Sequence, residues 1–444
     1  MTQKADPNTK PRTLIVGGGF TGLAAAYELA RAGLPVTVLE ADPDVGGLAG
    51  SFDVDGVSLE RFYHHWFTND RHVMDLIQEL GQQDRILLRP TRTGMYYANN
   101  FYRLSTPKDL LTFKPLGFID RVRLGYLALK ARRVKDWMAL EDITAKQWLI
   151  DMAGENVYRV VWEPLMAGKF GPFADKISAV WMWNKLKLRG GSRGKGAAEM
   201  LAYYRGGFAS LAQSLADEIV KHGGEILTNH PVNELYITDH RVTGLRAAGK
   251  DFEADRVLLT TPLPIAADLI QPHADAAYVD SLRRIEYLAN VCLVLELDRS
   301  LSETYWLNVN DPSFPYVAVI EHTNFEPPET YHGKRIVYLS KYLPADAELY
   351  RMSDEQVFEF SLPHIQRMFP DFDRSWVQGH HVWRARYSQP IVGKHYSKLI
   401  PAERMPVDGM YLATMAQIYP EDRGTNYAIR EGRAVGKRLV ESLS

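Results

Sequence analysis

Residues 13–40 read TLIVGGGFTGLAAAYELARAGLPVTVLE, and this stretch decides the fold. The apolar run at 13–16 predicts a short strand, and the helix formers at 23–32 predict a helix after a glycine-rich turn. Gly33 suits the left-handed end of that helix, and residues 35–40 predict a second strand. A strand, a tight turn, a helix and a strand in this order indicate an α/β fold with a parallel sheet.

The glycines of the turn match a dinucleotide-binding motif in its full structural context. Gly17 permits the tight turn, Gly19 lets the backbone approach a pyrophosphate, and Gly22 lets the helix pack closely on the strand. The helix N-terminus offers free N–H groups and a positive dipole end to the phosphates. Glu40 ends the second strand, where its carboxylate is expected to accept hydrogen bonds from the adenosine ribose.

Composition narrows the class of protein. The 444 residues favour two or three domains, and 52 Lys and Arg against 54 Asp and Glu give a net charge of −2. This balance gives no overall attraction to nucleic acid. The single cysteine, Cys292, lies in a strand-like run, which indicates a packed thiol and a reducing compartment. Neither an apolar leader nor a membrane span stands out, so we expect a cytoplasmic protein.

A second glycine pair follows Glu40 in DPDVGGLAGSF, residues 42–52. This spacing resembles the FAD-binding superfamily of amine oxidases, protoporphyrinogen oxidases and phytoene desaturases. The resemblance implies that Gly46 and Gly47 let the backbone pass close to FAD. Leu48 stands where the family often has an arginine. A contact of this side chain with the flavin or the phosphates would therefore differ from the contact in the family. The resemblance also implies noncovalent FAD, because Cys292 does not match the covalent attachment site of some amine oxidases.

Two later blocks resemble the same superfamily, in the family's order. Residues 204–235 carry a glycine pair before an amphipathic helix, and the resemblance implies that the backbone of Val232 contacts the adenine. Residues 252–262, FEADRVLLTTP, resemble the returning strand, which ends near Thr261. The third block is GMYLATMAQIYPEDRGTNYAIREGRAVGKRL at 409–439. These blocks predict a discontinuous FAD-binding domain made of residues 1–75, 200–265 and 405–444.

The third block departs from the family at one point. An aspartate commonly follows the strand there and holds the ribityl chain, whereas this chain reads Ala413-Thr414-Met415. Glu421 or Asp422 are candidate substitutes. A helix is still expected to follow, and its N-terminal dipole would favour negative charge on the flavin. The resemblance implies flavin contacts from its first residues, Gly424, Thr425 and Asn426.

Two insertions, residues 76–199 and 266–404, are expected to form one α+β substrate domain with a mixed or antiparallel sheet. The whole chain is thus predicted as α/β, with a Rossmann-like FAD domain of the GR2 type. Within the first insertion, residues 110–137 combine apolar side chains with many Lys and Arg. This segment is either a solvated basic helix that covers its own core or a peripheral membrane contact.

Residues 62–70 read FYHHWFTND and place His64 beside His65. Adjacent strand residues point to opposite faces, so the pair does not predict a metal site. The segment also resembles the sequence after the glycine pair in UDP-galactopyranose mutases, a branch of the same superfamily. That resemblance implies that His65 lies beside the flavin, with His64 as the second candidate catalytic residue.

Other candidates for contact with substrate come from the third block and the second insertion. Arg423 and Tyr419 are predicted as catalytic residues because of their place near the expected flavin. Tyr427 is a further candidate from the third block, and Trp306, His322 and Arg386 in the second insertion are weaker candidates.

The resemblance implies an FAD-dependent oxidoreductase that oxidises or desaturates a hydrophobic or ring-containing small molecule by hydride transfer to flavin N5. A lipid-like or sugar-linked substrate fits this expectation. Two alternatives remain open at this point. The first is a flavin-dependent sugar isomerase similar to the mutases. The second is a Rab-GDI-like binding protein, which would share the architecture without catalysis.

Overall fold

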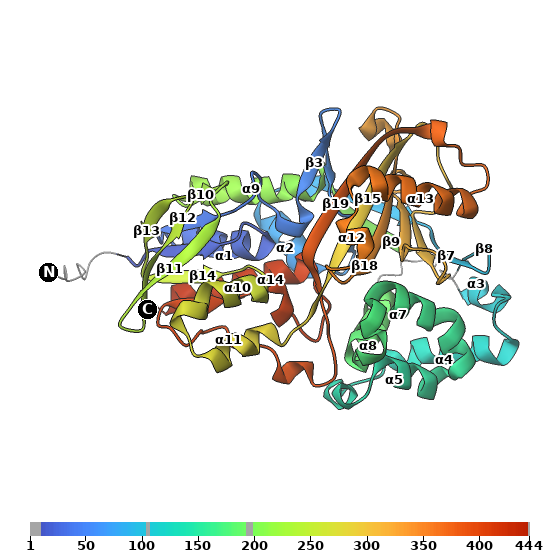
Figure 1. The fold of residues 1–444 in the computed structure, drawn as a ribbon, viewed down its shortest axis with the longest axis horizontal. Helices are drawn as coiled ribbons and strands as arrows, with labels where there is room; N and C mark the ends of the chain where they lie inside the picture. The colour runs from blue at the N-terminus through green and yellow to red at the C-terminus, as the bar shows by residue number, and fades with distance from the viewer. Residues whose placement is uncertain (1–9, 104–106, 192–198, 443–444) are drawn as a thin grey trace.

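The computed structural model describes residues 10–103, 107–191 and 199–442. One end of the molecule contains a five-stranded parallel sheet whose strands come from three separated parts of the chain (Figure 1). In spatial order the strands are β10 (Glu225–Leu227), β2 (Val36–Leu39), β1 (Thr13–Val16), β14 (Arg256–Leu259) and β20 (Met410–Leu412). The strands are short and almost entirely apolar, as expected for a parallel sheet with both faces covered.

Helix α1 (Phe20–Arg31) lies at the centre of this end and is buried over ten of its twelve residues. It packs against α9 (Gly207–Lys221) and α14 (Thr425–Glu441). Gly432 of α14 allows the close approach, since a Cβ there would lie 2.2 Å from the carbonyl oxygen of Thr21. The neighbouring elements are α2 (Arg71–Glu79), α10 (Leu263–Ile270), α11 (Ala276–Arg283) and the antiparallel strands β11 (Val232–Thr238), β12 (Arg241–Ala247) and β13 (Lys250–Glu253).

The other end is built on a seven-stranded mixed sheet. Its spatial order is β19 (Val377–Pro390), β15 (Tyr287–Leu297), β18 (Arg335–Leu343), β17 (Ala318–Glu321), β16 (Trp306–Val309), β7 (Thr93–Tyr97) and β8 (Asn100–Arg103). All pairs are antiparallel except β16 with β7. The expected α/β class, with a mixed sheet in the inserted part, is therefore confirmed. Helix α13 (Asp354–Met368) packs against β19 and starts with a capping box at Ser353.

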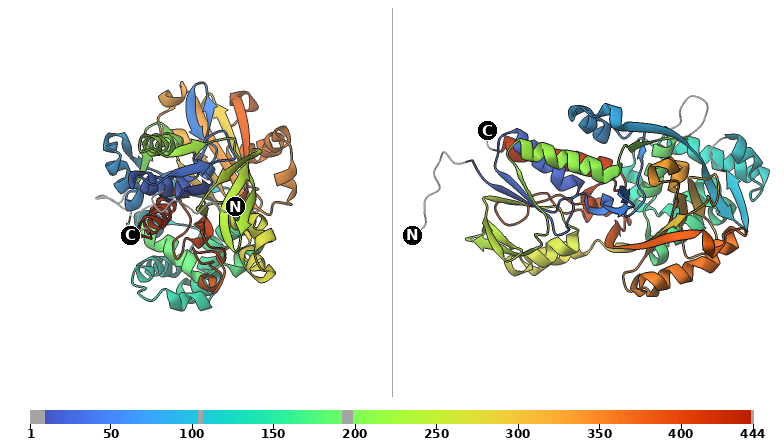
Figure 2. Two further views of the ribbon diagram at one scale, coloured as in Figure 1. Left: turned by 90° about the vertical axis from the view of Figure 1, so that its left-hand side faces the viewer. Right: turned by 90° about the horizontal axis from the view of Figure 1, so that it is seen from above.

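A group of helices lies beside this sheet (Figures 1 and 2). It comprises α3 (Pro107–Thr112), α4 (Phe118–Ala131), α5 (Ala145–Ala153), α6 (Glu155–Val157), α7 (Glu163–Phe170) and α8 (Ala179–Gly191). Five short strands form two small antiparallel sheets: β3 (Ser51–Val54) pairs with β4 (Val57–Glu60), and β9 (Glu199–Tyr204) lies between β5 (Trp66–Phe67) and β6 (Ile86–Thr91). Within the described residues, no helix combines the length and apolarity needed to cross a membrane.

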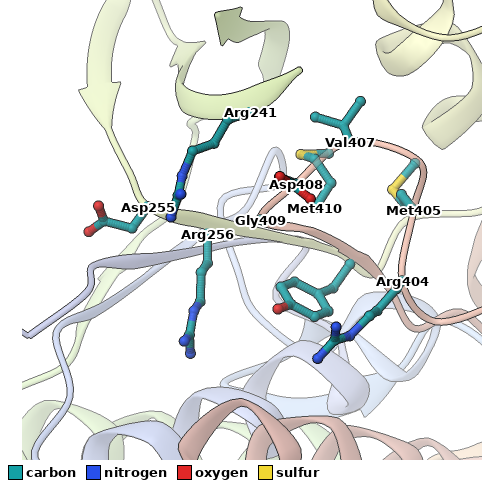
Figure 3. A pocket seen from close by; sticks show the side chains of 10 residues that line it. Arg241, Asp255, Arg256, Arg404, Met405, Val407, Asp408, Gly409 and Met410 are labelled. Atoms are coloured by element: carbon teal, nitrogen blue, oxygen red, sulfur yellow. The ribbon is translucent and has the colours of Figure 1, made fainter. Parts of the chain in front are cut away.

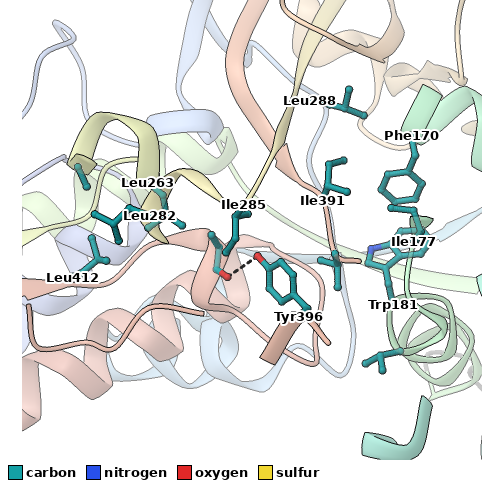
Figure 4. Packing of buried hydrophobic residues seen from close by; sticks show 14 of the residues in the cluster. Phe170, Ile177, Trp181, Leu263, Leu282, Ile285, Leu288, Ile391, Tyr396 and Leu412 are labelled. Atoms are coloured by element: carbon teal, nitrogen blue, oxygen red, sulfur yellow. Dashed lines mark hydrogen bonds between the residues drawn. The ribbon is translucent and has the colours of Figure 1, made fainter. Parts of the chain in front are cut away.

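Apolar packing is continuous between the parallel sheet and these helices (Figure 4). Leu412 of β20 belongs to the same buried cluster as Phe170 of α7 and Trp181 of α8. Between them Tyr396 is fully buried and donates a hydrogen bond to the carbonyl of Ala416 at 2.8 Å. The two ends of the molecule therefore share one core where residues 391–417 pass between them.

Candidate active site

The glycine-rich turn between β1 and α1 has the geometry that the motif requires. Gly17 has φ +110°, a value that favours glycine, and its N–H donates to the carbonyl of Leu39 at 2.8 Å. A Cβ at Gly22 would lie 2.0 Å from the carbonyl oxygen of Gly17, so only glycine fits. Gly19 starts α1 with no side-chain cap, which leaves the first N–H groups of the helix available to an anion.

The second glycine pair lies directly against this turn. Gly46 donates to the carbonyl of Gly18 at 2.9 Å, and both Gly46 and Gly47 have positive φ. A Cβ on Gly47 would lie 3.2 Å from the Cα of Gly19. The two glycine segments, more than twenty residues apart in sequence, thus form one backbone surface with no side chains on it.

Glu40 follows β2 at the carboxyl edge of the sheet. One carboxylate oxygen accepts from the N–H of Gly18 at 2.6 Å, and the other accepts from the N–H of Asp42 at 2.9 Å. The residue is half-buried. The carboxylate is therefore fixed in orientation beside the glycine turn, where the sequence places the ribose contact.

The remaining predicted cofactor residues from the first and second blocks lie around the same edge. Thr261 follows β14, and its hydroxyl oxygen is buried without a hydrogen-bond partner. Val232 begins β11, just after His230, whose N–H donates to the carbonyl of Glu40 at 2.7 Å. Leu48 is half-buried in the short turn that follows the glycine pair.

The segment after β20 is held by hydrogen bonds among its own residues. The side chain of Thr414 accepts from the N–H of Ala416, and the side chain of Gln417 accepts from the N–H of Thr414. The two candidate substitutes for the family's aspartate are both ion-paired: Glu421 with Arg430 at 3.1 Å and Asp422 with Lys185 at 2.6 Å.

The N-terminus of α14 is tied to the FYHHWFTND segment. Thr425 accepts a hydrogen bond from the indole N–H of Trp66 at 2.7 Å, and Asn426 accepts from the N–H of Val73 at 3.1 Å. Gly424 is exposed and precedes the helix. Because Asn426 is buried against α2, its side chain positions α14, while Gly424 and Thr425 remain at the accessible helix start.

The two adjacent histidines point in different directions. The ring of His64 packs on Phe208, and its Nδ1 hydrogen-bonds to the carbonyl of Phe62 at 2.6 Å. Burial lowers the pKa of His64 to about 4, and the charge of Arg423 adds to this effect. His65 instead hydrogen-bonds to the hydroxyl of Tyr305 at 2.9 Å. The structure therefore brings His64 into the field of Arg423.

A cluster of charged side chains surrounds Arg423, and sequence reasoning missed most of it. Arg423 donates to the hydroxyl of Tyr342 at 3.0 Å. The ammonium of Lys169 lies 4.7 Å from the centre of the Tyr342 ring, and Lys185 pairs with Asp422. These five residues come from α7, α8, β18 and the loop before α14, and we call them the cation cluster. The available signal was a lysine inside each of two apolar helices, MAGKFG and WMWNKLK.

Electrostatics within the cation cluster are strong. Burial raises the pKa of the Tyr342 phenol, but Arg423 and Lys169 outweigh this and bring it below its usual value. Burial also opposes ionisation of Asp422, yet Lys185, Lys169 and Arg423 hold its pKa well below the usual range. Burial lowers the pKa of Lys169. The arrangement strongly favours negative charge at this place.

The other predicted site residues lie outside the cation cluster. Tyr419 donates to the carboxylate of Glu141 at 2.5 Å and packs on Trp137. Tyr427 faces α2, with Arg430 over its ring. The three weaker candidates lie in the second sheet or its connections: Trp306 packs edge-on against Tyr63, His322 is fully buried and hydrogen-bonds to Tyr331, and Arg386 is exposed on β19.

A pocket of about 220 Å³ lies elsewhere, at the beginning of β14 and β20 (Figure 3). Its lining includes Arg241, Arg256, Arg404 and Asp408. Ligands of open α/β sheets bind at the opposite, carboxyl edge, where the glycine turn lies. This pocket is therefore separate from the site described above. Among the described residues no group of three or more His, Cys, Asp or Glu could hold a metal ion.

Comparison with known proteins places these features in context. Residues 20–439 match the family described as flavin containing amine oxidoreductase. Coproporphyrinogen III oxidase of Propionibacterium freudenreichii subsp. freudenreichii is 24% identical over 330 residues, which cover 60% of this chain and 59% of that protein. Polyamine oxidase 3 of Oryza sativa subsp. japonica is 22% identical over 443 residues, which cover 91% of this chain and 84% of the relative. The chain thus spans about three-fifths of the length of the first relative.

Solved structures share the fold over nearly the whole chain. An oxidoreductase from Methanosarcina mazei superposes with a TM-score of 0.74 at 18% identity, covering 96% of this chain and 100% of that one. Cyclohexylamine oxidase from Brevibacterium oxydans IH-35A gives a TM-score of 0.70 at 15% identity, covering 98% and 99%. At these identities the likeness shows the fold alone.

Proposed function

This chain belongs to the family of flavin-containing amine oxidoreductases, and from that membership we propose that it is an FAD-dependent oxidoreductase. Its substrate would be a hydrophobic or ring-containing small molecule that is oxidised or desaturated. The observation that supports this most directly is the pairing of the Gly17–Gly22 turn with the Gly46–Gly47 turn at the carboxyl edge of the parallel sheet.

The residues present fit a noncovalently held FAD. Added Cβ atoms would fill the surface formed by the two glycine segments, so that surface suits a close backbone approach to the pyrophosphate. The buried, unpartnered hydroxyl of Thr261 and the oriented carboxylate of Glu40 are groups that a nucleotide would satisfy. Cys292 is fully buried and burial raises its pKa, so it is a poor candidate for covalent attachment. We assign residues 1–75, 200–265 and 405–444 to the FAD domain and the remainder to the substrate domain.

The side chains at the start of α14 would orient the reaction. FAD, when bound, supplies the hydride acceptor for oxidation of a substrate carbon. Thr425, held by Trp66, fixes the first turn of α14, whose N–H groups favour negative charge nearby. His64 stays neutral at ordinary pH because of its low pKa, so it can donate or accept a hydrogen bond without adding charge. We therefore propose His64 and Arg423 as the side chains that border the reacting groups.

Visible absorption of the purified protein tests this proposal. We expect flavin bands, release of intact FAD on denaturation, and anaerobic loss of the oxidised-flavin absorbance with porphyrinogens, carotenoid precursors or amines. Flavin-free protein that cannot be reconstituted with FAD would refute the proposal and favour a Rab-GDI-like binding protein. Rearrangement of a nucleotide sugar only after chemical reduction would favour the isomerase instead.

We also propose that the protein contacts membranes peripherally through α4, while remaining on the cytoplasmic side. Five large apolar side chains of this helix are more than half exposed: Phe118, Ile119, Val122, Tyr126 and Leu129. By contrast, only Leu127 and Ala131 of the helix are buried. Exposed basic residues follow at Lys130, Arg132, Arg133 and Lys135. An apolar face with adjacent cations is the pattern that seats a helix on anionic lipid.

Vesicle co-sedimentation tests the membrane proposal. We expect wild-type protein to bind phosphatidylglycerol vesicles and the double variant Phe118→Ser, Ile119→Ser to bind about tenfold more weakly, because apolar area is lost. Val220→Ser removes a similarly exposed residue from α9 and serves as the control. Equal binding by the double variant and wild type would refute the contact.

A further inference from the structure

The cation cluster contains more positive than negative charge. Lys169, Lys185 and Arg423 face a single carboxylate, that of Asp422, which is 8% exposed. Lys185 already pairs with Asp422 at 2.6 Å. In the described part of the chain, Lys169 and Arg423 form no ion pair. Because charges removed from water require compensation, two cations at this place indicate that a further anion binds there.

The unsatisfied donors of the cluster point to the same conclusion. The Nε of Arg423 is buried and has no hydrogen-bond partner, although Nη2 donates to Tyr342. The ammonium of Lys169 lies over aromatic rings, 4.7 Å from the centre of Tyr342 and 5.5 Å from that of Trp181. Arginine offers a planar set of donors that matches carboxylate and phosphate oxygens, and lysine adds a point charge.

The location of the cluster connects it with the substrate. Arg423 immediately precedes the start of α14, and its charge acts on His64. Lys169 and Tyr342 come from α7 and β18, which belong to the helices and the mixed sheet. The donors therefore lie where the parallel-sheet end meets the helices and the mixed sheet. A ligand there would have its anionic end held between the two parts of the molecule.

We propose that Lys169 and Arg423 bind an anionic oxygen group of the substrate, a carboxylate or a phosphate, with the Tyr342 hydroxyl completing the site. This inference rests on the proposed function, since it names the substrate class of the same site. The same positive field repels ammonium groups, so this chain disfavours free polyamines although a polyamine oxidase is among its relatives.

Three probes with one ring and different charges test the inference: benzoate, phenyl phosphate and benzylamine. Calorimetry on the flavin-containing protein should show binding of at least one anion, weakened by salt, and no binding of benzylamine. Lys169→Gln and Arg423→Gln should each weaken anion binding about tenfold or more. Lys187→Gln, which removes an exposed cation of α8 from the ring of Trp183, should leave binding unchanged.

The relative affinities separate the two sources of the anion. Tighter binding of benzoate would identify a carboxylate, and tighter binding of phenyl phosphate would identify a phosphate. If benzylamine binds best, or if both glutamine variants bind the anions as wild type does, the inference is wrong. Arg423→Lys keeps the charge without the planar fork and provides a second variant if Arg423→Gln does not fold.

The experiment distinguishes this inference from the proposed function. If the protein cannot hold flavin but still binds anions through Lys169, the inference stands and the oxidoreductase proposal is wrong. Flavin that is reduced by an amine, with no anion binding, would retain the oxidoreductase and remove the inference. A loss of flavin affinity in Lys169→Gln without any change in anion affinity would assign the cluster to the cofactor and overturn the inference.

Discussion

The glycine turn and the cation cluster represent two ways of building a site. Gly17, Gly19, Gly22 and Glu40 lie within 24 consecutive positions, and the backbone of the turn requires glycine at Gly17 and Gly22. The cation cluster instead draws Lys169, Lys185, Tyr342, Asp422 and Arg423 from four separate elements. The first site is therefore specified by short-range pattern, while the second exists only after the chain has folded. Substitutions should affect the two sites in different ways.

The largest effect is expected at the turn. Gly22→Leu would place side-chain atoms against the carbonyl of Gly17, where even a Cβ would lie at 2.0 Å. We expect a loss of about 3 kcal/mol or more in the free energy of unfolding and no retained flavin. Chemical denaturation and the ratio of flavin to protein absorbance measure both. Gly117→Ala, at a glycine with open space and negative φ, is the control. A Gly22→Leu protein that keeps its flavin would refute the local account.

The cation cluster should respond more moderately. Asp422→Asn leaves Lys185 without its partner and should lower the free energy of unfolding by about 2–3 kcal/mol, less than for a fully buried pair because Lys185 is partly exposed. The depressed pKa of Asp422 means that its stabilisation is present above the usual carboxyl pKa and is lost as pH falls below about 4. Wild type and variant should therefore converge in acid. Asp44→Asn, an exposed substitution, should match wild type throughout.

The buried side chain of His322 allows a third test, which compares the pH dependence of stability in wild type and a variant. Burial lowers the pKa of His322 to about 3, so the unfolded chain binds its proton first as pH falls below 6.5. The free energy of unfolding should drop by about 2 kcal/mol between pH 6.5 and 5 from this residue alone. His322→Asn should flatten the pH dependence by that amount in urea titrations. Parallel curves for wild type and variant would show that the pKa of His322 does not differ between the folded and the unfolded chain.

The smallest effect is expected at Tyr419, where a substitution tests whether this residue belongs to the active site. Tyr419→Phe removes one hydrogen bond to the buried Glu141 and should cost about 1 kcal/mol in the free energy of unfolding. It should leave substrate KM unchanged, because its hydroxyl lies against Glu141 rather than in the cation cluster. A large rise in KM with unchanged stability would instead support the sequence-based prediction that Tyr419 is catalytic.

The sequence was sufficient to predict motifs that lie within one short segment. It was not sufficient to predict side-chain contacts between segments that are far apart in the chain. The strand, turn and helix around Gly17–Gly22, the mixed sheet and the α/β class followed from spacing, composition and resemblance. Lys169 and Lys185 were missed because a lysine within an apolar helix gives no sign that the chain will return beside it, at Asp422 and Arg423, more than 230 positions later. The direction of His64 and His65 also depends on Phe208 and Tyr305, which sequence adjacency does not reveal.

The order in which the parallel sheet is assembled has a consequence for synthesis in the cell. Strand β1 pairs with β14, and the N–H of Arg12 reaches Asp255 across 243 positions. Helix α1 acquires its cover from α14 only when Gly432 and Gly436 pack on it. Helix α9 can cover part of α1 earlier, but the face of α1 that contacts α14 stays exposed until nearly the whole chain has been synthesised. Such late closure slows folding and exposes the nascent chain to aggregation, so chaperone supply and early flavin availability should govern the yield of native protein.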